Sequence, residues 1–277
     1  MSIANIIFLI LLILLLIWVL NRLFFRTNII YDKILKAADE NNGENNNTIN
    51  NADFLENSTS NFMISVWFFV DSWGKEISNE KNILFMGTDK FNTLPDELKD
   101  TQISISNKHC VLSSSDNITN KNLSISLDKY ENNLFIDIET YDDGRSTTDS
   151  SACYTRYKIE NIPIQKWNCL TLSVDTKTLD VYLDGKLRNS FILHGIYKNK
   201  YEDNSKKNIY LGNNGNSPGF EGFITRVRYE PNSINPQEAY NIYRDGINAS
   251  LANSIFNKYR LKVSFLEYNK ERGSFQI

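Results

Sequence analysis

Cysteine and histidine are scarce in this chain, with three cysteines and two histidines among 277 residues. A small secreted domain stabilised by disulfides usually carries more cysteines, in even number. No two of Cys110, Cys153 and Cys169 have the spacing of zinc ligands, and His109 and His194 lie far apart in the sequence. We therefore expect free, buried thiols, with one Cys110–Cys153 disulfide as the alternative.

An excess of charge of either sign is also missing, because 30 lysines and arginines balance 33 aspartates and glutamates. This balance provides no basic surface of the kind that nucleic-acid binding requires, so we expect no nucleic-acid partner. Aromatic residues, in contrast, are plentiful, with 14 tyrosines and 16 phenylalanines. Their abundance favours strands over helices.

Charge is wholly absent from one long apolar run near the N-terminus. Residues 3–20 read IANIIFLILLILLLIWVL, in which Asn5 is the one polar side chain. Leu23, Phe24 and Phe25, just after Asn21 and Arg22, bring the apolar stretch close to the roughly 20 residues that a helix needs to cross a bilayer. Trp18 lies near its end, where an indole ring favours the membrane interface. We predict a single transmembrane helix that anchors the chain over residues 1–26.

A cleavable signal peptide is the alternative interpretation of this segment. It would require a positively charged start and a cleavage site between small residues. Residues 1–5 contain no charged side chain, and the residues after Leu20 are large or basic. A retained membrane anchor therefore fits the sequence better.

The charges beside the anchor predict its orientation. Arg22, Arg26, Lys33 and Lys36 all follow the apolar run, and positively charged flanks stay on the cytosolic side of a membrane. We therefore expect the C-terminal part on the cytosolic side. Five Asn-x-Ser/Thr glycosylation sequons favour the opposite, luminal orientation, and they begin at Asn46, Asn57, Asn117, Asn122 and Asn248.

Residues 27–61 have the composition of a spacer rather than of a packed domain. Residues 28–38 (NIIYDKILKAA) are expected to form a short juxtamembrane helix that continues the anchor as a stalk. Nine of the residues 41–61 are asparagine. Because such a stretch offers little apolar surface to bury, we predict a flexible tether there.

Strand-like sequence begins at residue 62, where FMISVWFFVD is dense in aromatic and β-branched residues. Short runs of this kind recur about every ten residues, which is typical of a sandwich or a barrel. They cover residues 83–86, 102–106, 123–127, 134–138, 154–159, 169–175, 180–183, 191–193, 209–211, 223–229 and 259–266. One short helix is expected where Asn235 and Pro236 precede residues 239–243. We predict one antiparallel all-β domain over residues 62–277.

A β-hairpin is predicted around Asp184 and Gly185. Residues 179–183 (LDVYL) alternate polar with apolar side chains, and an Asp-Gly pair supplies the positive φ angles that a two-residue turn requires. Trp167 opens the preceding strand. We expect its large ring to lie between the two sheets of the sandwich.

Several segments, in this order and spacing, resemble the superfamily of concanavalin A-like lectins and laminin G-like modules, including its pentraxin-type members. They are FMISVWFFV at 62–70, WNCLTLSVD and LDVYLDGKL within 167–187, IYLG and GFEGFITRVRY within 209–229, and NPQE and YRDG within 235–246. The resemblance implies a jelly-roll antiparallel sandwich. The whole arrangement, with its tail YRLKVSF and GSFQI, is similar to membrane-anchored sandwich proteins of large nucleocytoplasmic DNA viruses.

The resemblance extends to glycoside hydrolases, but their catalytic sequence pattern is absent. Those enzymes carry a Glu-x-Asp-x-x-Glu run that places paired carboxylates beside the scissile bond. The nearest match is DIETYDD at residues 137–143, whose spacing differs. Asp137 and Glu139 would share one face of a strand, which a solvated outer face explains equally well. We therefore expect a protein that is not an enzyme.

Ligand sites are predicted in two polar loops. Laminin G-like and pentraxin-like domains often bind calcium at the rim of the sandwich, and Asp142, Asp143 and Asp149 lie in a suitable loop over residues 141–152. A solvated loop without an ion is the simpler alternative. Asn213, Asn214 and Asn216 lie in a second rim loop, which is either a ligand contact or an ordinary turn.

Two functions remain open at this point. The first, favoured by the predicted topology, is a structural membrane protein of a virion or of its internal or host intracellular membrane, whose sandwich docks other proteins of the adjacent layer. The second is a lectin-like adhesion module that binds glycans. A glycoside hydrolase is the least favoured interpretation.

Overall fold

A computed structural model describes residues 12, 15, 29–39, 47–50, 60–74, 77–87, 111–112, 121–141, 152–198, 208–213, 218–247, 262–267 and 270–276. For residues 111–112, 121, 152–154, 262–267 and 270–276 only the backbone is described. The expected anchor over residues 1–26 lies outside this part of the chain, apart from Leu12 and Leu15. Among the described residues, no helix is long and apolar enough to cross a membrane.

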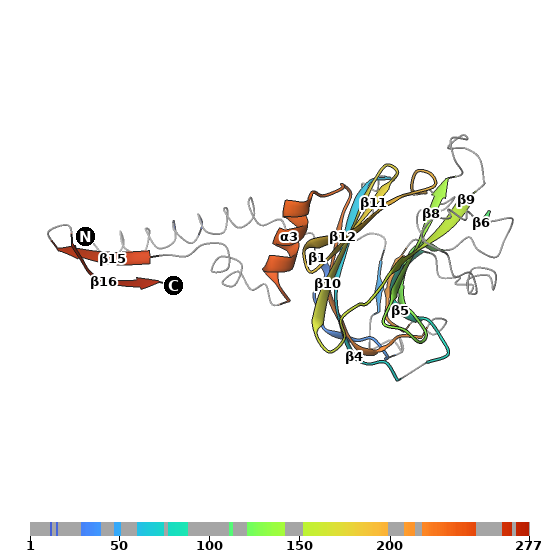
Figure 1. Cartoon of the computed structure of the whole chain (residues 1–277), viewed down its shortest axis with the longest axis horizontal. Helices are drawn as coiled ribbons and strands as arrows, with labels where there is room; N and C mark the ends of the chain where they lie inside the picture. Colours follow the sequence, from blue (N-terminus) through green and yellow to red (C-terminus); the bar gives the residue numbers. More distant parts are fainter. Residues whose placement is uncertain are drawn as a thin grey trace.

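Two antiparallel sheets face each other across one apolar core (Figure 1). Sheet A has the strand order β1-β14-β4-β10-β11-β12, and β2 also pairs with β14. Its strands are β1 (Ile29–Tyr31), β2 (Leu35–Lys36), β4 (Phe62–Ser72), β10 (Trp167–Asp175), β11 (Thr178–Leu183), β12 (Lys186–Ile192) and β14 (Glu221–Glu230). The predicted antiparallel sandwich is confirmed.

Sheet B has the order β3-β13-β5-β7-β8-β9-β6. Its strands are β3 (Thr48–Ile49), β5 (Lys81–Gly87), β6 (Val111–Leu112), β7 (Lys121–Leu127), β8 (Leu134–Tyr141), β9 (Ala152–Ile159) and β13 (Asn208–Leu211). A separate hairpin joins β15 (Lys262–Glu267) to β16 (Lys270–Gln276). The strand expected at 102–106 lies outside the described residues, and every other expected run coincides with or overlaps a strand.

The core forms because the central strands alternate between two faces. Phe62, Ile64 and Phe68 of β4 point into the space between the sheets, as do Leu170 and Leu172 of the neighbouring β10. All five are almost fully buried. Burial of each such side chain stabilises the fold by about 1.5–3 kcal/mol relative to exposure.

The helical stalk expected over residues 28–38 is wrong. Instead, β1 and β2 pair with β14, and β3 pairs with β13, so this region forms edges of both sheets. Leu35 and Ala37 are buried in the core, and a Cβ added to Gly219 would lie 1.6 Å from the carbonyl oxygen of Ala37. The sandwich therefore includes residues before the expected boundary at residue 62, among them part of the expected tether.

The position expected for Trp167 is also wrong. Its odd-numbered position in β10 places it on the outer face of sheet A, where it packs against a second, smaller cluster formed by Met63, Trp67, Cys169 and Ile242. Its ring is half-buried beside Phe69, with the ring centroids 5.7 Å apart. Strand alternation, rather than the size of the ring, decided which face it occupies.

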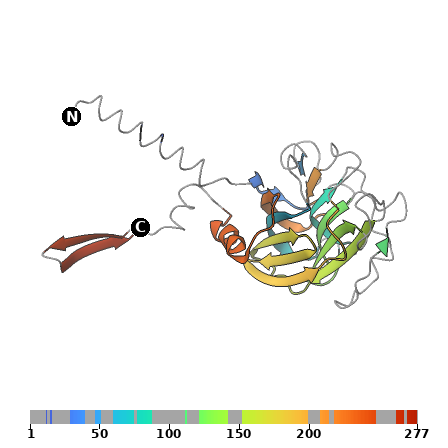
Figure 2. The same cartoon turned by 90° about the horizontal axis from the view of Figure 1, so that it is seen from above.

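The outer cluster is covered by the predicted helix, α3 (Pro236–Asp245), which lies on the side of sheet A away from sheet B (Figures 1 and 2). The Asn235 side chain accepts a hydrogen bond from the Glu238 amide, and the Glu238 carboxylate accepts one from the Asn235 amide. This reciprocal capping, together with Pro236 in the first turn, fixes where the helix begins.

Two further predictions are confirmed. Asp184 and Gly185 have φ angles of 52° and 72°, as the tight turn between β11 and β12 requires. Cys169 is a buried free cysteine, and burial raises the pKa of its thiol to about 11. The side chains of Cys110 and Cys153 lie outside the described residues.

Candidate functional site: a groove at one end of the sandwich

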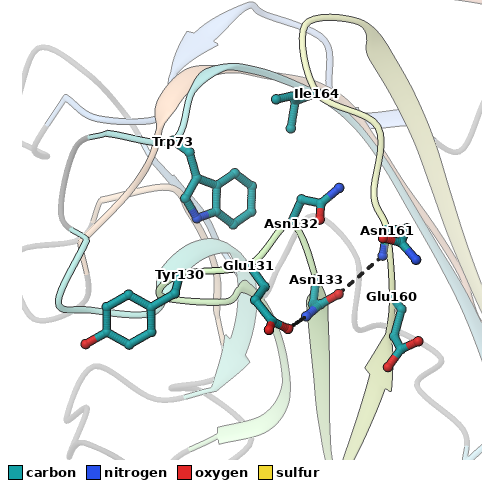
Figure 3. Close-up of a pocket in the computed structure, with 8 residues that line it drawn as sticks. All are labelled: Trp73, Tyr130, Glu131, Asn132, Asn133, Glu160, Asn161 and Ile164. Atoms are coloured by element: carbon teal, nitrogen blue, oxygen red, sulfur yellow. Dashed lines mark hydrogen bonds between the residues drawn. The ribbon is translucent and has the colours of Figure 1, made fainter.

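A groove of about 600 Å³ opens at the end of the sandwich where β4, β7 and β9 finish. Three connections line it: the residue after β4, the turn between β7 and β8, and the segment between β9 and β10. Figure 3 shows its lining, which consists of Trp73, Tyr130, Glu131, Asn132, Asn133, Glu160, Asn161 and Ile164. The volume falls within the range of small-ligand sites.

A buried lysine supports the aromatic side of the groove. The Lys81 ammonium donates hydrogen bonds to the carbonyl oxygens of Asp128 and Lys129, at 3.2 and 3.0 Å. It also lies 4.9 Å from the centre of the Trp73 ring, within the range of a cation–π contact. The Trp73 indole in turn donates to the Lys129 carbonyl at 3.3 Å. These contacts hold the ring against the β7–β8 turn.

Asn133 fixes the floor of the groove. Its side-chain nitrogen donates to the Glu131 carboxylate at 2.5 Å, and its side-chain oxygen accepts from the Asn161 amide at 3.2 Å (Figure 3). Asn132 makes a second bridge between the same two loops, because its side chain donates to the Ile162 carbonyl and its carbonyl accepts from the Ile162 amide. The two loops are therefore held in one arrangement before any ligand arrives.

Several lining side chains remain open to solvent. The exposed fraction of Tyr130 is 69% and that of Ile164 is 44%, and Glu131 and Glu160 are also exposed. The Lys158 ammonium lies between the two carboxylates, 3.4 Å from Glu131 and 3.6 Å from Glu160. The groove thus combines an apolar surface with hydrogen-bonding groups and about one net negative charge.

Of the six rim residues predicted from the sequence, the structure describes Asn213, which does not line this groove. Asn213 is used internally: its side chain donates to the Ala38 carbonyl, its amide donates to the Ala37 carbonyl, and its own carbonyl accepts from the Asn47 side chain. These contacts join residues 37, 38 and 47 to the chain that follows β13. The other five predicted ligand residues, namely Asp142, Asp143, Asp149, Asn214 and Asn216, lie outside the described residues.

Of the five sequons, the structure describes one asparagine. Asn122 in β7 is fully buried and donates to the Glu139 carboxylate at 3.1 Å and to the Lys198 carbonyl at 2.9 Å. A glycan on Asn122 would replace one of the two hydrogens on this nitrogen, so at least one of these hydrogen bonds would be lost. Asn46, Asn57, Asn117 and Asn248 lie outside the described residues.

The carboxylates of Asp137 and Glu139 do share one face of β8, but that face is not solvated as expected. Arg156 donates to Asp137 at 2.6 and 2.8 Å and to Glu80 at 2.6 and 3.0 Å. Glu139 pairs with the Lys198 ammonium at 3.2 Å. Burial alone would lower the pKa of Arg156, yet its two carboxylate partners outweigh that effect and raise it.

Within the described part of the chain, no group of three or more histidine, cysteine, aspartate or glutamate side chains could hold a metal ion. The calcium-binding loop expected around Asp142 lies outside the described residues. The sequence does not reveal the groove, because its lining comes from three separate connections. The one sequence feature that could have indicated the groove is KYENN at residues 129–133, a polar turn segment that contains an aromatic residue.

The fold is an antiparallel sandwich of the concanavalin A-like type. The chain belongs to the concanavalin A-like lectin/glucanases superfamily, whose laminin G-type family matches residues 95–239, more than half of the sequence. No curated protein sequence matches this chain.

Solved structures with a similar sandwich include a receptor-binding domain of a botulinum neurotoxin C/D mosaic serotype, with 11% identity and a TM-score of 0.43 over 72% of this chain. A Trypanosoma rangeli sialidase gives 12% identity and a TM-score of 0.41 over 69%. Domain 4 of an arabinanase from Geobacillus stearothermophilus, in complex with arabinotriose, gives 15% and 0.36 over 67%. The chain spans 40%, 24% and 68% of those three proteins, respectively.

Proposed function

We propose that the sandwich is a non-catalytic binding module that takes up a carbohydrate in the groove at the ends of β4, β7 and β9. One observation carries the proposal: aromatic and hydrogen-bonding side chains line a single open groove whose loops are already fixed to each other. Sugars offer the matching chemistry, because their C–H faces pack on aromatic rings while their hydroxyls bond to amides and carboxylates. Pre-formed loops lower the entropy cost of binding.

The charges of the groove favour a neutral sugar over an acidic one. Glu131 and Glu160 flank a single ammonium, that of Lys158, so the site carries excess negative charge. The two carboxylates can accept hydrogen bonds from sugar hydroxyls. An acidic sugar would bring a third carboxylate to the same place and be repelled.

The ion pairs on the outer face of sheet B support the non-catalytic part of the proposal. A glycoside hydrolase needs one carboxyl that can donate a proton and another that can attack or activate water. Asp137 and Glu139 are each paired with a cationic side chain, and all of their carboxylate oxygens accept hydrogen bonds from protein donors, so neither presents a free carboxyl to a substrate.

The apolar residues 3–20 support display of this module from a membrane, as the sequence predicts. A purely structural role, in which the sandwich docks neighbouring proteins of a virion or intracellular membrane layer, is the alternative. It becomes the better account if the groove binds no carbohydrate.

The test is binding of the purified full chain, in a non-ionic detergent, to an array of neutral and sialylated oligosaccharides, followed by calorimetric titration of any ligand found. Tyr130→Ala should weaken binding by about fivefold to tenfold, as loss of one aromatic contact does. Tyr240→Ala is the matched control, because Tyr240 is an exposed tyrosine on α3, far from the groove in sequence and on another element. Equal affinity of Tyr130→Ala and the parent protein, or no binding to any sugar at millimolar concentration, would refute the proposal.

A further inference from the structure

A β-bulge in β14 turns two arginines to the same side of sheet A. Thr225 pairs with Trp67 and Arg228 pairs with Ser65, so two residues of β14 lie opposite one residue of β4. Arg226 adopts a positive φ of 48° at this point, a conformation that costs energy for a residue with a side chain. Ile224 and Val227 still face the core. The bulge therefore places both Arg226 and Arg228 on the outer face, beside the end of α3.

The guanidinium of Arg226 is buried but only partly used. Its side chain is 1% exposed, and its Nη1 donates to the Gly246 carbonyl at 2.6 Å, just after α3 ends. Within the described part of the chain, its Nε and Nη2 donate no hydrogen bond, and neither does the Nε of Arg228. Nε and Nη2 form the side of a guanidinium that binds an oxyanion through two parallel hydrogen bonds. That double donor site on Arg226 is empty.

Arg156 is a buried arginine with a structural role, and its donors, unlike those of Arg226, are bonded to carboxylates. Its Nε and Nη2 donate to the two oxygens of Asp137, and its Nη1 and Nη2 donate to those of Glu80. The carboxylate of Asp32 lies 3.9 Å from the Nε of Arg226, beyond hydrogen-bond distance, and the charge of Asp245 also acts on this guanidinium. The Asp32 side chain is 70% exposed, whereas the Nε of Arg226 is buried.

The positive charges of the two arginines also repel each other. Burial, followed by the charge of Arg228, holds the pKa of Arg226 below its ordinary value. Arg228 has one partner for its own charge, the Asp245 carboxylate at 3.2 Å. A buried donor without an acceptor destabilises the folded state, and a charged donor does so more than a neutral one. An oxyanion that accepted hydrogen bonds from these three nitrogens, Nε and Nη2 of Arg226 and Nε of Arg228, would remove this cost.

We propose that Arg226 and Arg228 form a binding site for a phosphate group on the outer face of sheet A, next to the end of α3. A tetrahedral phosphate has enough oxygens to bond the paired donors of Arg226 and the Nε of Arg228 together, and arginine suits phosphate for this reason. The site is distinct from the groove, which lies at the end of the sandwich.

The position of the site makes a lipid headgroup one source of that phosphate. Ile29 pairs directly with Arg228, and the apolar run ends four residues earlier, at Phe25. Four residues span at most about 14 Å. If the apolar run inserts in a bilayer, the arginine pair is held close to its phosphate layer. A soluble phosphate compound is the other source.

The experiment follows thermal unfolding and ³¹P line broadening of the purified full chain, in non-ionic detergent, as inorganic phosphate is added at constant ionic strength. Phosphate should raise the unfolding temperature and chloride should not. Arg226→Lys keeps the charge but loses the paired donors, and should weaken phosphate binding at least tenfold. Arg244→Lys, the same change at an exposed arginine of α3, should leave binding unchanged. Equal stabilisation by chloride, or identical titrations of Arg226→Lys and the parent chain, would overturn the proposal.

Asp32→Asn provides a second test of the phosphate site, which does not depend on whether Arg226→Lys folds. If the site receives phosphate, removing the nearby carboxylate should tighten phosphate binding. If Asp32 is itself the intended partner of Arg226, this variant should unfold at lower temperature without phosphate and should gain nothing from phosphate, which sinks the proposal. Short-chain phosphatidic acid identifies the source: binding at least tenfold tighter than inorganic phosphate indicates a lipid, whereas equal or weaker binding indicates a soluble compound.

Discussion

Replacement of Leu35 by alanine tests whether the residues before Phe62 truly belong to the sandwich. Leu35 lies in the two-residue strand β2, opposite Ile224 of β14, and is 5% exposed within the main core. The substitution removes three buried carbons, worth about 0.8 kcal/mol each, or about 2.4 kcal/mol in total. The cavity left behind adds to this, so a loss of about 2.5–5 kcal/mol in the free energy of unfolding is expected.

The neighbouring residue supplies the control. Ile34 is 63% exposed, so Ile34→Ala should change the free energy of unfolding by less than about 0.5 kcal/mol. Urea denaturation of the full chain, followed by tryptophan fluorescence, measures both variants on one scale. A helical stalk outside the domain would make both changes small and similar. A loss below about 1 kcal/mol for Leu35→Ala would therefore refute the assignment of β2 to the core.

Two other predictions follow from burial and titration. Trp167→Ala, on the half-buried outer face, should cost clearly less in urea denaturation than Phe68→Ala in the main core, for which about 3–5 kcal/mol is expected; equal losses would contradict the two-cluster arrangement. Burial raises the pKa of Tyr229 to about 12. Because the folded state keeps this proton longer than the unfolded chain, its contribution is intact below pH 10 and is lost as the pH rises toward 12. Tyr229→Phe should flatten that part of the stability profile, and an unchanged slope would contradict the assignment.

The central strands could be predicted from the sequence because their side-chain patterns are local. The run beginning at Phe62 and the alternation from Leu179 to Leu183 each carry their own signal, as does the Asp184–Gly185 turn between its strands. The capping residues Asn235 and Glu238 likewise mark the start of α3 without help from the rest of the chain. For these elements, local preference and tertiary packing agree.

Other features depend on partners distant in the sequence. Strands β1, β2 and β3 have two or three residues each, too few to show a periodic pattern, and they exist because β13 and β14 offer free edges. The face occupied by Trp167 depends on the register between β10 and β4. Neither register nor edge pairing can be read from one short segment, because both are fixed by long-range backbone hydrogen bonds.

The sequence by itself determined the all-β class, the main hairpin and the capped helix, because each follows from side-chain periodicity or from turn and cap chemistry within a few residues. The tertiary structure alone decided where function can reside. It brought Trp73, Tyr130 and Asn161 together from three connections, and it turned Arg226 beside Arg228 through a bulge. Both arrangements arise from contacts across the sheets, where residues far apart in the chain meet and neighbours in the chain point to opposite faces.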